Sequence, residues 1–229
     1  MSNLPKPYYD DGRGIVIYHG DAREILPLLP KVDLVFTDPP YGISIATQPF
    51  RYQRMAGKEK EEWDEGPFDD INLILKAGKE AVIWGGNYYN LPPSRGWLCW
   101  FKPDRTPSMA DFELAWTSRD MNSRQIKVTV ADTNKERVGH FAQKPLKVMT
   151  FSLSFFPDAQ TVLDPFMGSG TTLVAAKQLG RKCIGIELEE KYAEIAATRL
   201  AQGILDFNDE GRILETLQGN KAPLRFEGM

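Results

Sequence analysis

The chain has 229 residues, of which 42% are hydrophobic and 26% charged, and its formal net charge is −3. These values are typical of one globular domain with a single core, and they exclude a polycation that binds nucleic acid through overall charge. No stretch approaches about eighteen consecutive apolar residues, and the first fourteen residues are polar, which argues against a membrane span or a signal peptide. We therefore expect a cytoplasmic protein.

The two cysteines, Cys99 and Cys183, lie in apolar runs without the spacing of metal ligands. Neither is next to a histidine or a second thiol. We expect them to be buried, reduced thiols, and the sequence predicts no metal site.

The first elements in chain order alternate between β-rich and helical segments. Residues 15–18 predict a strand, residues 22–29 a short helix that Pro30 ends, and residues 32–37 a second, buried strand. The tetrapeptide at residues 38–41, Asp-Pro-Pro-Tyr, follows this strand directly and can continue neither a strand nor a helix. Open α/β sheets keep their chemistry at such strand ends.

The middle of the chain begins with a long polar segment. Residues 42–66 lack apolar periodicity, which indicates a functional loop or a disordered segment. Residues 69–79 then predict a helix. Three strand candidates follow, at residues 81–84, 97–101 and 112–116.

The last part of the chain returns to regular alternation. Residues 145–156 predict a helix, residues 161–163 a strand, residues 173–179 a helix, residues 183–186 a strand and residues 189–202 a helix. Strands that alternate with helices of this length predict an α/β fold with a doubly wound, mostly parallel sheet.

Two glycines, Gly168 and Gly170, stand between the strand at 161–163 and the helix that follows it. Glycine at such a turn lets the backbone approach a ligand closely. Leu173 occupies the place of the third glycine of a dinucleotide fingerprint, and the segment has no lysine for a phosphate loop, so a diphosphate fits poorly. A tight structural connection is the alternative reading of this loop.

Acidic residues close three of the predicted strands. Glu187 ends the strand after the glycine loop, where a carboxylate can accept hydrogen bonds from ribose hydroxyls; the alternative is a solvated acid that starts a helix. Asp21 and Asp164 also follow strands and can face a positive charge or an amino group. These residues therefore favour a nucleoside that has a positive charge and no phosphate. S-adenosylmethionine is such a nucleoside.

The Asp-Pro-Pro-Tyr run has the chemistry to hold an exocyclic amine. The Asp38 carboxylate and the Pro39 carbonyl supply two hydrogen-bond acceptors, Pro40 stiffens the turn, and Tyr41 offers a face on which an extruded base can stack. Two acceptors on the amine free its lone pair for direct, in-line attack on a methyl group, without a covalent intermediate. A rigid turn with a capping Asp is the structural alternative.

At these residues the chain resembles the amino methyltransferases of DNA, in the beta-type permuted group in which the catalytic motif precedes the cofactor motif. The matching motifs lie at residues 20–22, 38–41, 62–64, 85–89, 113–116, 140–145 and 164–172. The resemblance implies a Rossmann-like sheet of the S-adenosylmethionine-dependent methyltransferase type. An Asp at position 38, where other members have Ser, implies N6 of adenine as the methyl acceptor.

The resemblance also implies site residues. The catalytic residues would be Asp38, Pro39, Pro40 and Tyr41. Lys144 is expected near the carboxylate of the cofactor, and together with the acids and glycines above the implied cofactor-binding residues are Asp21, Ala22, Asp38, Lys144, Asp164, Phe166, Gly168, Ser169, Gly170, Thr171 and Glu187.

The resemblance divides a single domain, residues 1–229, into a catalytic half at 15–116, a short target-recognition insert at 117–139, a cofactor half at 140–203 and a tail at 204–229. Basic residues in the long polar loop and the insert are the candidate DNA contacts, with solvated surface as the alternative. These residues are Arg51, Arg54, Lys58, Arg124, Lys127, Lys135 and Arg137.

The expected partner is double-stranded DNA, and because the insert is short we also expect a homodimer. The resemblance further implies a restriction-modification partner. The alternatives are an N4-cytosine methyltransferase of the same architecture and a DNA-binding subunit without catalysis. A protein glutamine methyltransferase would have Asn at position 38 and an earlier glycine loop, so it is disfavoured.

Overall fold

The computed structural model describes residues 4–42, 68–107, 109–136 and 143–201, and the backbone of two short strands beyond them. The strands are β1 (Tyr9–Asp10), β2 (Ile15–His19), β3 (Val32–Thr37), β4 (Gly78–Trp84), β5 (Trp97–Phe101), β6 (Phe112–Thr117), β7 (Arg124–Lys127), β8 (Thr161–Asp164), β9 (Lys182–Glu187), β10 (Asp206–Phe207) and β11 (Ile213–Leu214). The helices are α1 (Ala22–Ile25), α3 (Ile71–Ala77), α4 (Val130–Glu136), α5 (Leu146–Leu153), α6 (Thr171–Gln178) and α7 (Glu190–Ala201), with 3₁₀ helices η1 (Leu26–Leu28) and η4 (Gly86–Tyr88).

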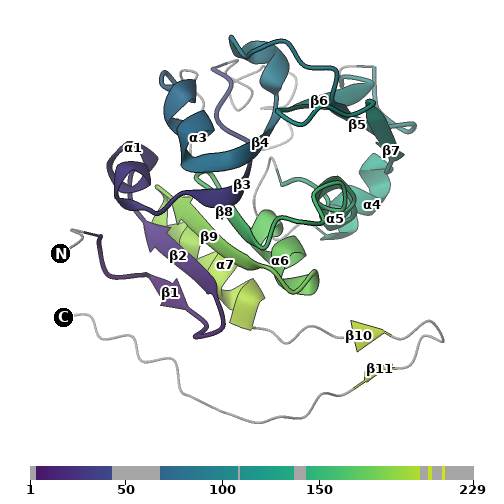
Figure 1. The fold of residues 1–229 in the computed structure, drawn as a ribbon. Helices are drawn as coiled ribbons and strands as arrows, with labels where there is room; N and C mark the ends of the chain where they lie inside the picture. The colour runs from purple at the N-terminus through teal and green to yellow at the C-terminus, as the bar shows by residue number, and fades with distance from the viewer. Residues whose placement is uncertain are drawn as a thin grey trace.

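The described strands build one nine-stranded sheet in the order β1-β2-β9-β8-β3-β4-β6-β5-β7, and β10 pairs separately with β11 (Figure 1). Strands β2, β9, β8, β3 and β4 run parallel to one another, and β1 pairs with β2 in the antiparallel direction. Strand β6 is antiparallel to both β4 and β5. The predicted mostly parallel α/β sheet is confirmed.

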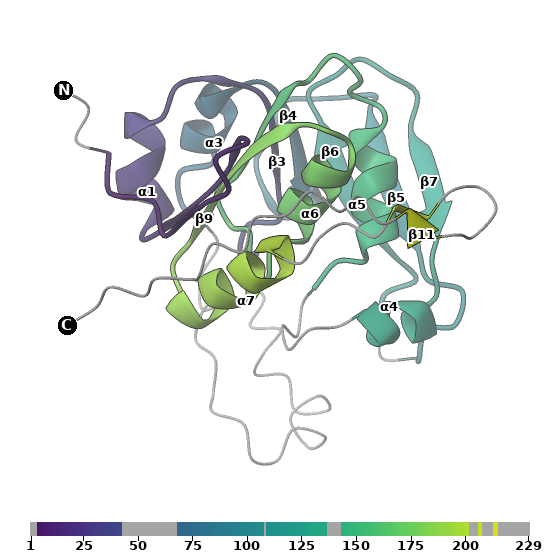
Figure 2. The same cartoon turned by 90° about the horizontal axis from the view of Figure 1, so that it is seen from below.

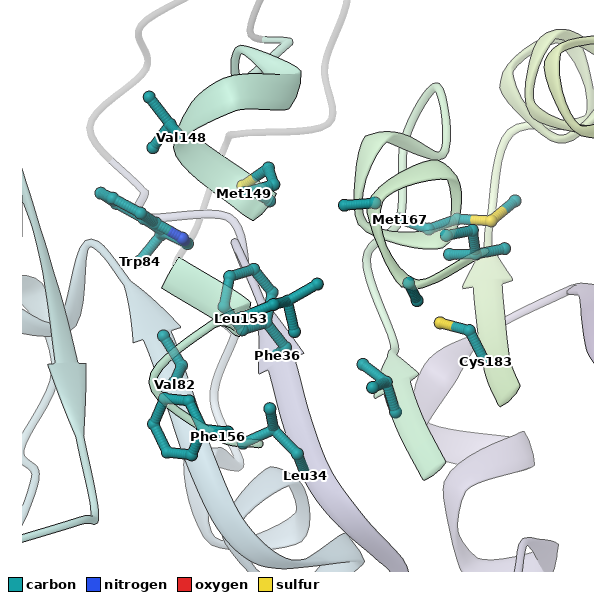
Figure 3. Close-up of a cluster of buried hydrophobic side chains, with 14 of the residues drawn as sticks. Leu34, Phe36, Val82, Trp84, Val148, Met149, Leu153, Phe156, Met167 and Cys183 are labelled. Carbon is teal, nitrogen blue, oxygen red and sulfur yellow. The ribbon is translucent and has the colours of Figure 1, made fainter. Parts of the chain in front are cut away.

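Helices cover both faces of the sheet. Helices α5, α6 and α7 lie together on one side, and α1 and α3 lie on the other (Figures 1 and 2). Alternation along β3 explains this: Leu34 and Phe36 join the core under α5, and Val35 joins the core under α1 and α3. Figure 3 shows Phe36 of β3 and Trp84 of β4 directed toward α5. A strand buried on both faces requires the near-continuous apolar run from which it was predicted.

The chain reverses its direction of winding between β3 and β8. From β3 the chain passes through α3 to β4 on one side, and from β8 it passes through α6 to β9 on the other. Because β3 and β8 are parallel neighbours, their carboxyl ends meet at one edge of the sheet. Ligands of open α/β sheets bind at such a switch point. The two loops that carry the sequence motifs both leave from it.

Several boundaries differ from the prediction, and three of them have a clear physical reason. The helix expected at 22–29 ends at Ile25 and continues as η1, because Pro27 has no amide hydrogen to extend the α-helical ladder. The helix expected at 69–79 ends at Ala77, since Gly78 already pairs with Val32 as the first residue of β4. The helix expected at 173–179 begins two residues earlier, directly after Gly170.

Part of the segment predicted for target recognition, residues 117–139, belongs to the regular secondary structure of the domain. It contains β7, which extends the sheet in parallel with β5, and α4. The polar sequence of β7 hid it from prediction, because an edge strand with exposed side chains has no apolar alternation. The predicted loop at 42–66 lies outside the described residues apart from Gly42. None of the helices in the described part of the chain has the length and apolar character that crossing a bilayer requires.

Candidate active site

Asp38 follows β3 and holds two side chains at the sheet edge. The hydroxyl of Tyr41 donates a short hydrogen bond to Asp38 Oδ1, and the ammonium of Lys144 donates another to Oδ2. The side chain of Asp38 keeps 21% of its exposure, so it remains accessible. The Asp-Pro-Pro-Tyr tetrapeptide and the lysine before α5 therefore meet, although 106 residues separate Asp38 from Lys144 in the sequence.

Lys144 belongs to a row of alternating charges. Its Nζ lies 3.0 Å from Glu113 Oε2, and the other oxygen of Glu113 accepts from Lys102. Both lysine side chains are only 7% exposed. We call Asp38, Lys144, Glu113 and Lys102 the four-charge cluster. It contains two carboxylates and two ammoniums, so its formal charges balance.

The pKa values in this cluster follow its charges. Burial favours the neutral form of Glu113, but Lys144 and Lys102 outweigh it and lower the pKa of Glu113 to about 2. Burial also favours neutral Lys144, yet Asp38 and Glu113 raise its pKa above the usual value. Both groups are therefore charged at neutral pH.

The ring of Tyr41 is fixed from two sides. It stacks on Tyr88 with 5.0 Å between ring centroids and 20° between planes. A β-carbon at Gly85, where φ is +66°, would lie 2.0 Å from the Tyr41 ring, so only glycine fits there. The Pro40 carbonyl accepts from the Tyr89 hydroxyl and from the amide of Phe68. The loop is rigid, and Tyr88 already covers one face of Tyr41.

Asp164 ends β8 beside this loop. Its Oδ1 accepts from the Thr37 hydroxyl at 2.8 Å and from the Phe166 amide at 3.1 Å, and the residue is only 2% exposed. Burial raises the pKa of Asp164 to about 6, against the opposing hydrogen bonds from Thr172 and Thr37, and the charge of Asp38 adds to the increase. Because Thr37 directly precedes Asp38, its hydrogen bond to Asp164 links the ends of the two loops.

The glycine loop runs from β8 into α6. Gly168 and Gly170 have φ values of 52° and 77°. The Gly168 amide donates to Glu187 Oε2 at 2.8 Å, so the acid at the end of β9 faces the loop as predicted from its position. A β-carbon at Gly170 would lie 2.7 Å from Ala196 Cβ in α7. Gly168 therefore donates its amide to Glu187, whereas the missing side chain of Gly170 allows α7 to pack closely against the loop.

The remaining cofactor candidates lie at neighbouring positions. Asp21 caps α1 and accepts from the Arg23 amide and guanidinium, which lowers its pKa, and Ala22 is buried in the same helix. Phe166 packs against Phe68 with ring centroids 5.0 Å apart. Ser169 and Thr171 are buried beside Gly170. Because β2 pairs with β9, Asp21 follows the strand next to Glu187.

The donor set around the glycine loop suits a nucleoside without phosphates. Arg199 is the described cation that contacts the loop, and its Nη1 is committed to the Ser169 carbonyl at 2.6 Å and the Thr171 hydroxyl at 3.2 Å. Carboxylates, which repel phosphate and bind hydroxyls or cations, dominate the rest. The residues fit a ligand with ribose hydroxyls and a positive charge.

The family model of the DNA methylases (N6_N4_Mtase) matches residues 83–198, just over half of the chain. The chain belongs to the DNA methylase family. Type II methyltransferase M2.LlaDCHI of Lactococcus lactis subsp. cremoris is 27% identical over 87% of this chain and 94% of its own length. Among solved structures, the M1.HpyAVI-SAM complex is 27% identical, covers 80% of this chain and 98% of its own, and has a TM-score of 0.53.

A third similar protein shares the fold. The PvuII DNA methyltransferase, described as cytosine-N4-specific, has a TM-score of 0.55 and 21% identity over 84% of this chain and 88% of its own. At that identity the similarity shows the architecture alone. This DNA methylase therefore has the sheet expected for S-adenosylmethionine-dependent methyltransferases.

The candidate DNA contacts of this DNA methylase are only partly described. Arg124 and Lys127 are exposed on β7, and Lys135 in α4 forms an ion pair with Asp132. Strand β7 runs in the same direction as β4, so Lys127 lies at the edge of the sheet that carries Asp38. Four other candidates lie outside the described residues, namely Arg51, Arg54, Lys58 and Arg137.

Sequence reasoning missed three contacts of this site. Lys102 was not singled out, and Glu113 was named only as the start of the motif at residues 113–116. A lysine and a glutamate beside each other in apolar strand sequences are nevertheless a signal of a buried pair. Arg199 was not singled out within the helix predicted at residues 189–202. Lys144 was expected near the cofactor carboxylate; the structure pairs it with Asp38 and Glu113, and the cofactor contact stays a prediction.

Proposed function

We propose that this DNA methylase transfers the methyl group of S-adenosylmethionine to the N6 amino group of adenine in double-stranded DNA. The observation that carries the proposal is the position of Asp38: an accessible carboxylate that is hydrogen-bonded to Tyr41 and directly follows Thr37, the residue that donates to Asp164 beside the glycine loop. An Asp at this position supports N6 of adenine, by the resemblance, over N4 of cytosine.

The cofactor assignment rests on the loop after β8. Glu187 would accept the ribose hydroxyls, and the positive charge of the ligand would be favoured by the carboxylates at the two strand ends. The remaining cofactor contacts would come from Asp21, Ala22, Asp38, Lys144, Asp164, Phe166, Gly168, Ser169, Gly170 and Thr171. When bound, the sulfonium supplies an electrophilic methyl group. M1.HpyAVI, 27% identical, is described as a complex with SAM, which supports the same ligand here.

Asp38 has the main catalytic role in this proposal. An exocyclic amine is a poor nucleophile because its lone pair is delocalised into the base. Hydrogen bonds from the amine to Asp38 and to the Pro39 carbonyl localise that lone pair, and a charged hydrogen bond of roughly 1.5–3 kcal/mol, realised in the transition state, gives about ten- to hundredfold in rate. As the N–C bond forms and the S–C bond breaks, the nitrogen gains positive charge, and Asp38 would take the proton it then loses.

The base must leave the duplex to reach Asp38, at an unstacking cost of a few kcal/mol. The exposed ring of Tyr88 already stacks on Tyr41, so the extruded base would use the remaining face of Tyr41 or the outer face of Tyr88. Stacking on an aromatic ring is worth roughly 1–3 kcal/mol for each base. This offsets part of the extrusion cost.

A homodimer is part of the proposal. Strand β7 and helix α4 take up much of segment 117–139, which leaves few residues of one copy for reading DNA sequence. A second copy would widen the DNA contact. Sedimentation of the chain with and without DNA tests this, and a monomer in both conditions would contradict it. A restriction enzyme as partner remains a hypothesis from the resemblance.

The test of the proposed function is a nucleoside analysis. Unmethylated duplex DNA is incubated with the chain and S-adenosylmethionine, digested to nucleosides and examined by mass spectrometry for N6-methyladenine and N4-methylcytosine. We expect N6-methyladenine, and Asp38→Ala should lower its formation by at least about tenfold with little change in DNA binding. Asp158→Ala, at a highly exposed acid, is the control. N4-methylcytosine as product, or full activity of Asp38→Ala, would overturn the proposal.

A further inference from the structure

We propose that Glu113 is a positioning residue that receives the Lys144 ammonium when the target amine binds to Asp38. The inference rests on the proposed function, because it assumes that Asp38 accepts the amine. It adds a residue that touches neither base nor cofactor in that function. Its basis is the geometry of the four-charge cluster.

Lys144 has two counter-ions within reach. Its Nζ donates to Asp38 Oδ2 and lies 3.0 Å from Glu113 Oε2. The side chain is only 7% exposed, so water cannot replace either carboxylate. A buried ammonium that loses its counter-ion is strongly destabilised. The Lys144 ammonium therefore has two neighbouring carboxylates, and a small movement of the ammonium shifts its main contact from Asp38 to Glu113.

The target amine competes with Lys144 for Asp38. In the structure, Tyr41 donates to Oδ1 of Asp38 and Lys144 donates to Oδ2, so both oxygens already have a donor. A carboxylate that neutralises an ammonium is a weaker acceptor for a neutral amine. Each oxygen can accept a second hydrogen bond, but Asp38 attracts the amine more strongly in the transition state when Lys144 loosens its contact.

Glu113 is held ready for that transfer. Its other oxygen accepts from Lys102, whose side chain is also 7% exposed and lies over the Trp100 ring at 4.5 Å. Lys102 therefore fixes the direction of the Glu113 carboxylate. The Lys144 Nζ lies 5.6 Å from the Trp84 ring centroid and 5.9 Å from that of Tyr41, and such aromatic faces favour a cation during a short displacement.

A different role for Glu113 is to neutralise two buried lysines and thereby stabilise the fold. The two roles make different predictions. If Glu113 acts through Lys144, its removal harms catalysis only while Lys144 is present. If Glu113 serves only the fold, its removal harms stability through Lys102, and the rate changes in the same proportion with or without Lys144.

The experiment is a double-mutant cycle on the single-turnover methylation rate at saturating DNA and S-adenosylmethionine. We expect Glu113→Gln to lower the rate about ten- to hundredfold, while the dissociation constant of the cofactor without DNA changes less than about threefold. In a Lys144→Met background, the same substitution should change the rate less than about threefold. An equal loss in both backgrounds, or a Glu113→Gln rate within about twofold of the unchanged protein, overturns the inference.

Two controls keep the result readable. The first control is the double variant Lys102→Met with Glu113→Gln, which removes both charges of the buried Lys102–Glu113 pair. This variant should recover the melting temperature lost in Glu113→Gln but not the methylation rate. Recovery of the rate would contradict the inference. Asp38→Asn in the same assay reports on the proposed function separately. If Asp38→Asn is nearly as active as the unchanged protein, the proposed function is wrong. If Asp38→Asn is inactive but Glu113→Gln and Lys144→Met show no coupling in the rate, only the inference about Glu113 is wrong.

Discussion

The Thr37 hydroxyl donates a 2.8 Å hydrogen bond to Asp164 Oδ1, and both residues are almost completely buried. This bond joins the last residue of β3 to the last residue of β8 at the point where the sheet changes its direction of winding. It therefore links the loop of Asp38 to the glycine loop. A displacement of either strand end would change the distance between the two halves of the site.

Asp164 should make stability depend on pH. Its pKa is raised from 3.8 to about 6 in the folded protein, mainly by burial, so its stabilising contribution is complete below pH 3.8 and is lost as pH rises through about 6. Relative to Asp164→Asn, which does not titrate, the free energy of unfolding should fall by roughly 3 kcal/mol across this window. Urea unfolding of both proteins at several pH values measures the difference. A difference that is constant with pH would refute the assignment.

Gly85→Ala should disable the site by displacing Tyr41. The new β-carbon would lie 2.0 Å from the Tyr41 ring, so the ring must leave the position in which its hydroxyl bonds to Asp38 and it stacks on Tyr88. Gly12→Ala is a matched control, because Gly12 has nearly the same φ, +65°, but nothing within 4 Å of the added carbon. We expect backbone strain of roughly 1–2 kcal/mol in both variants and a large loss of methylation in Gly85→Ala alone. Equal methylation rates in the two variants would contradict the role of the Tyr41 ring.

Glu187→Ala should weaken cofactor binding more than it slows turnover at saturating cofactor. The carboxylate accepts from the Gly168 and Glu189 amides, so its loss removes both the expected ribose acceptor and a support of the glycine loop. We expect the dissociation constant to rise at least about tenfold in calorimetry. Glu189→Ala, at an exposed acid two residues away, should have little effect. An unchanged affinity for Glu187→Ala would remove the ribose role.

Arg124 and Lys127 should contribute to DNA binding through charge. Both are exposed on β7, and Lys127 lies at the edge of the sheet that carries Asp38. Replacing both by Gln should reduce the slope of the logarithm of DNA affinity against that of salt concentration by about 1–2. The control replaces Lys31 and Lys182, two exposed lysines at the opposite, amino-terminal ends of β3 and β9. If the slopes of the two double variants agree, β7 is ordinary solvated surface.

Much of the central sheet could be predicted from short apolar runs. The strands with Leu34, Val82 and Leu163 are buried on both faces, so each needs a continuous apolar sequence that is visible without neighbours. The candidate motifs were visible for a related reason. Prolines and glycines after these strands stop regular structure, and polar residues beside them stand out.

Elements at the rim of the sheet were harder to predict. Strand β7 is polar and exposed, and it is a strand because its backbone pairs with β5 rather than because its side chains need burial. Helix α1 was predicted too long because Pro27 is compatible with the 3₁₀ turn that replaces the last helical turn. In each case a backbone hydrogen bond decided the outcome.

The sequence by itself determined the order of strands and helices along the chain and the identity of the two loops, since both depend on residues close together in the sequence. Only the tertiary structure decided that Lys144 lies between Asp38 and Glu113, and that Thr37 holds Asp164. Such pairs depend on which strands become neighbours in the sheet. That choice is made by the burial of whole strand faces, and no local spacing of residues encodes it.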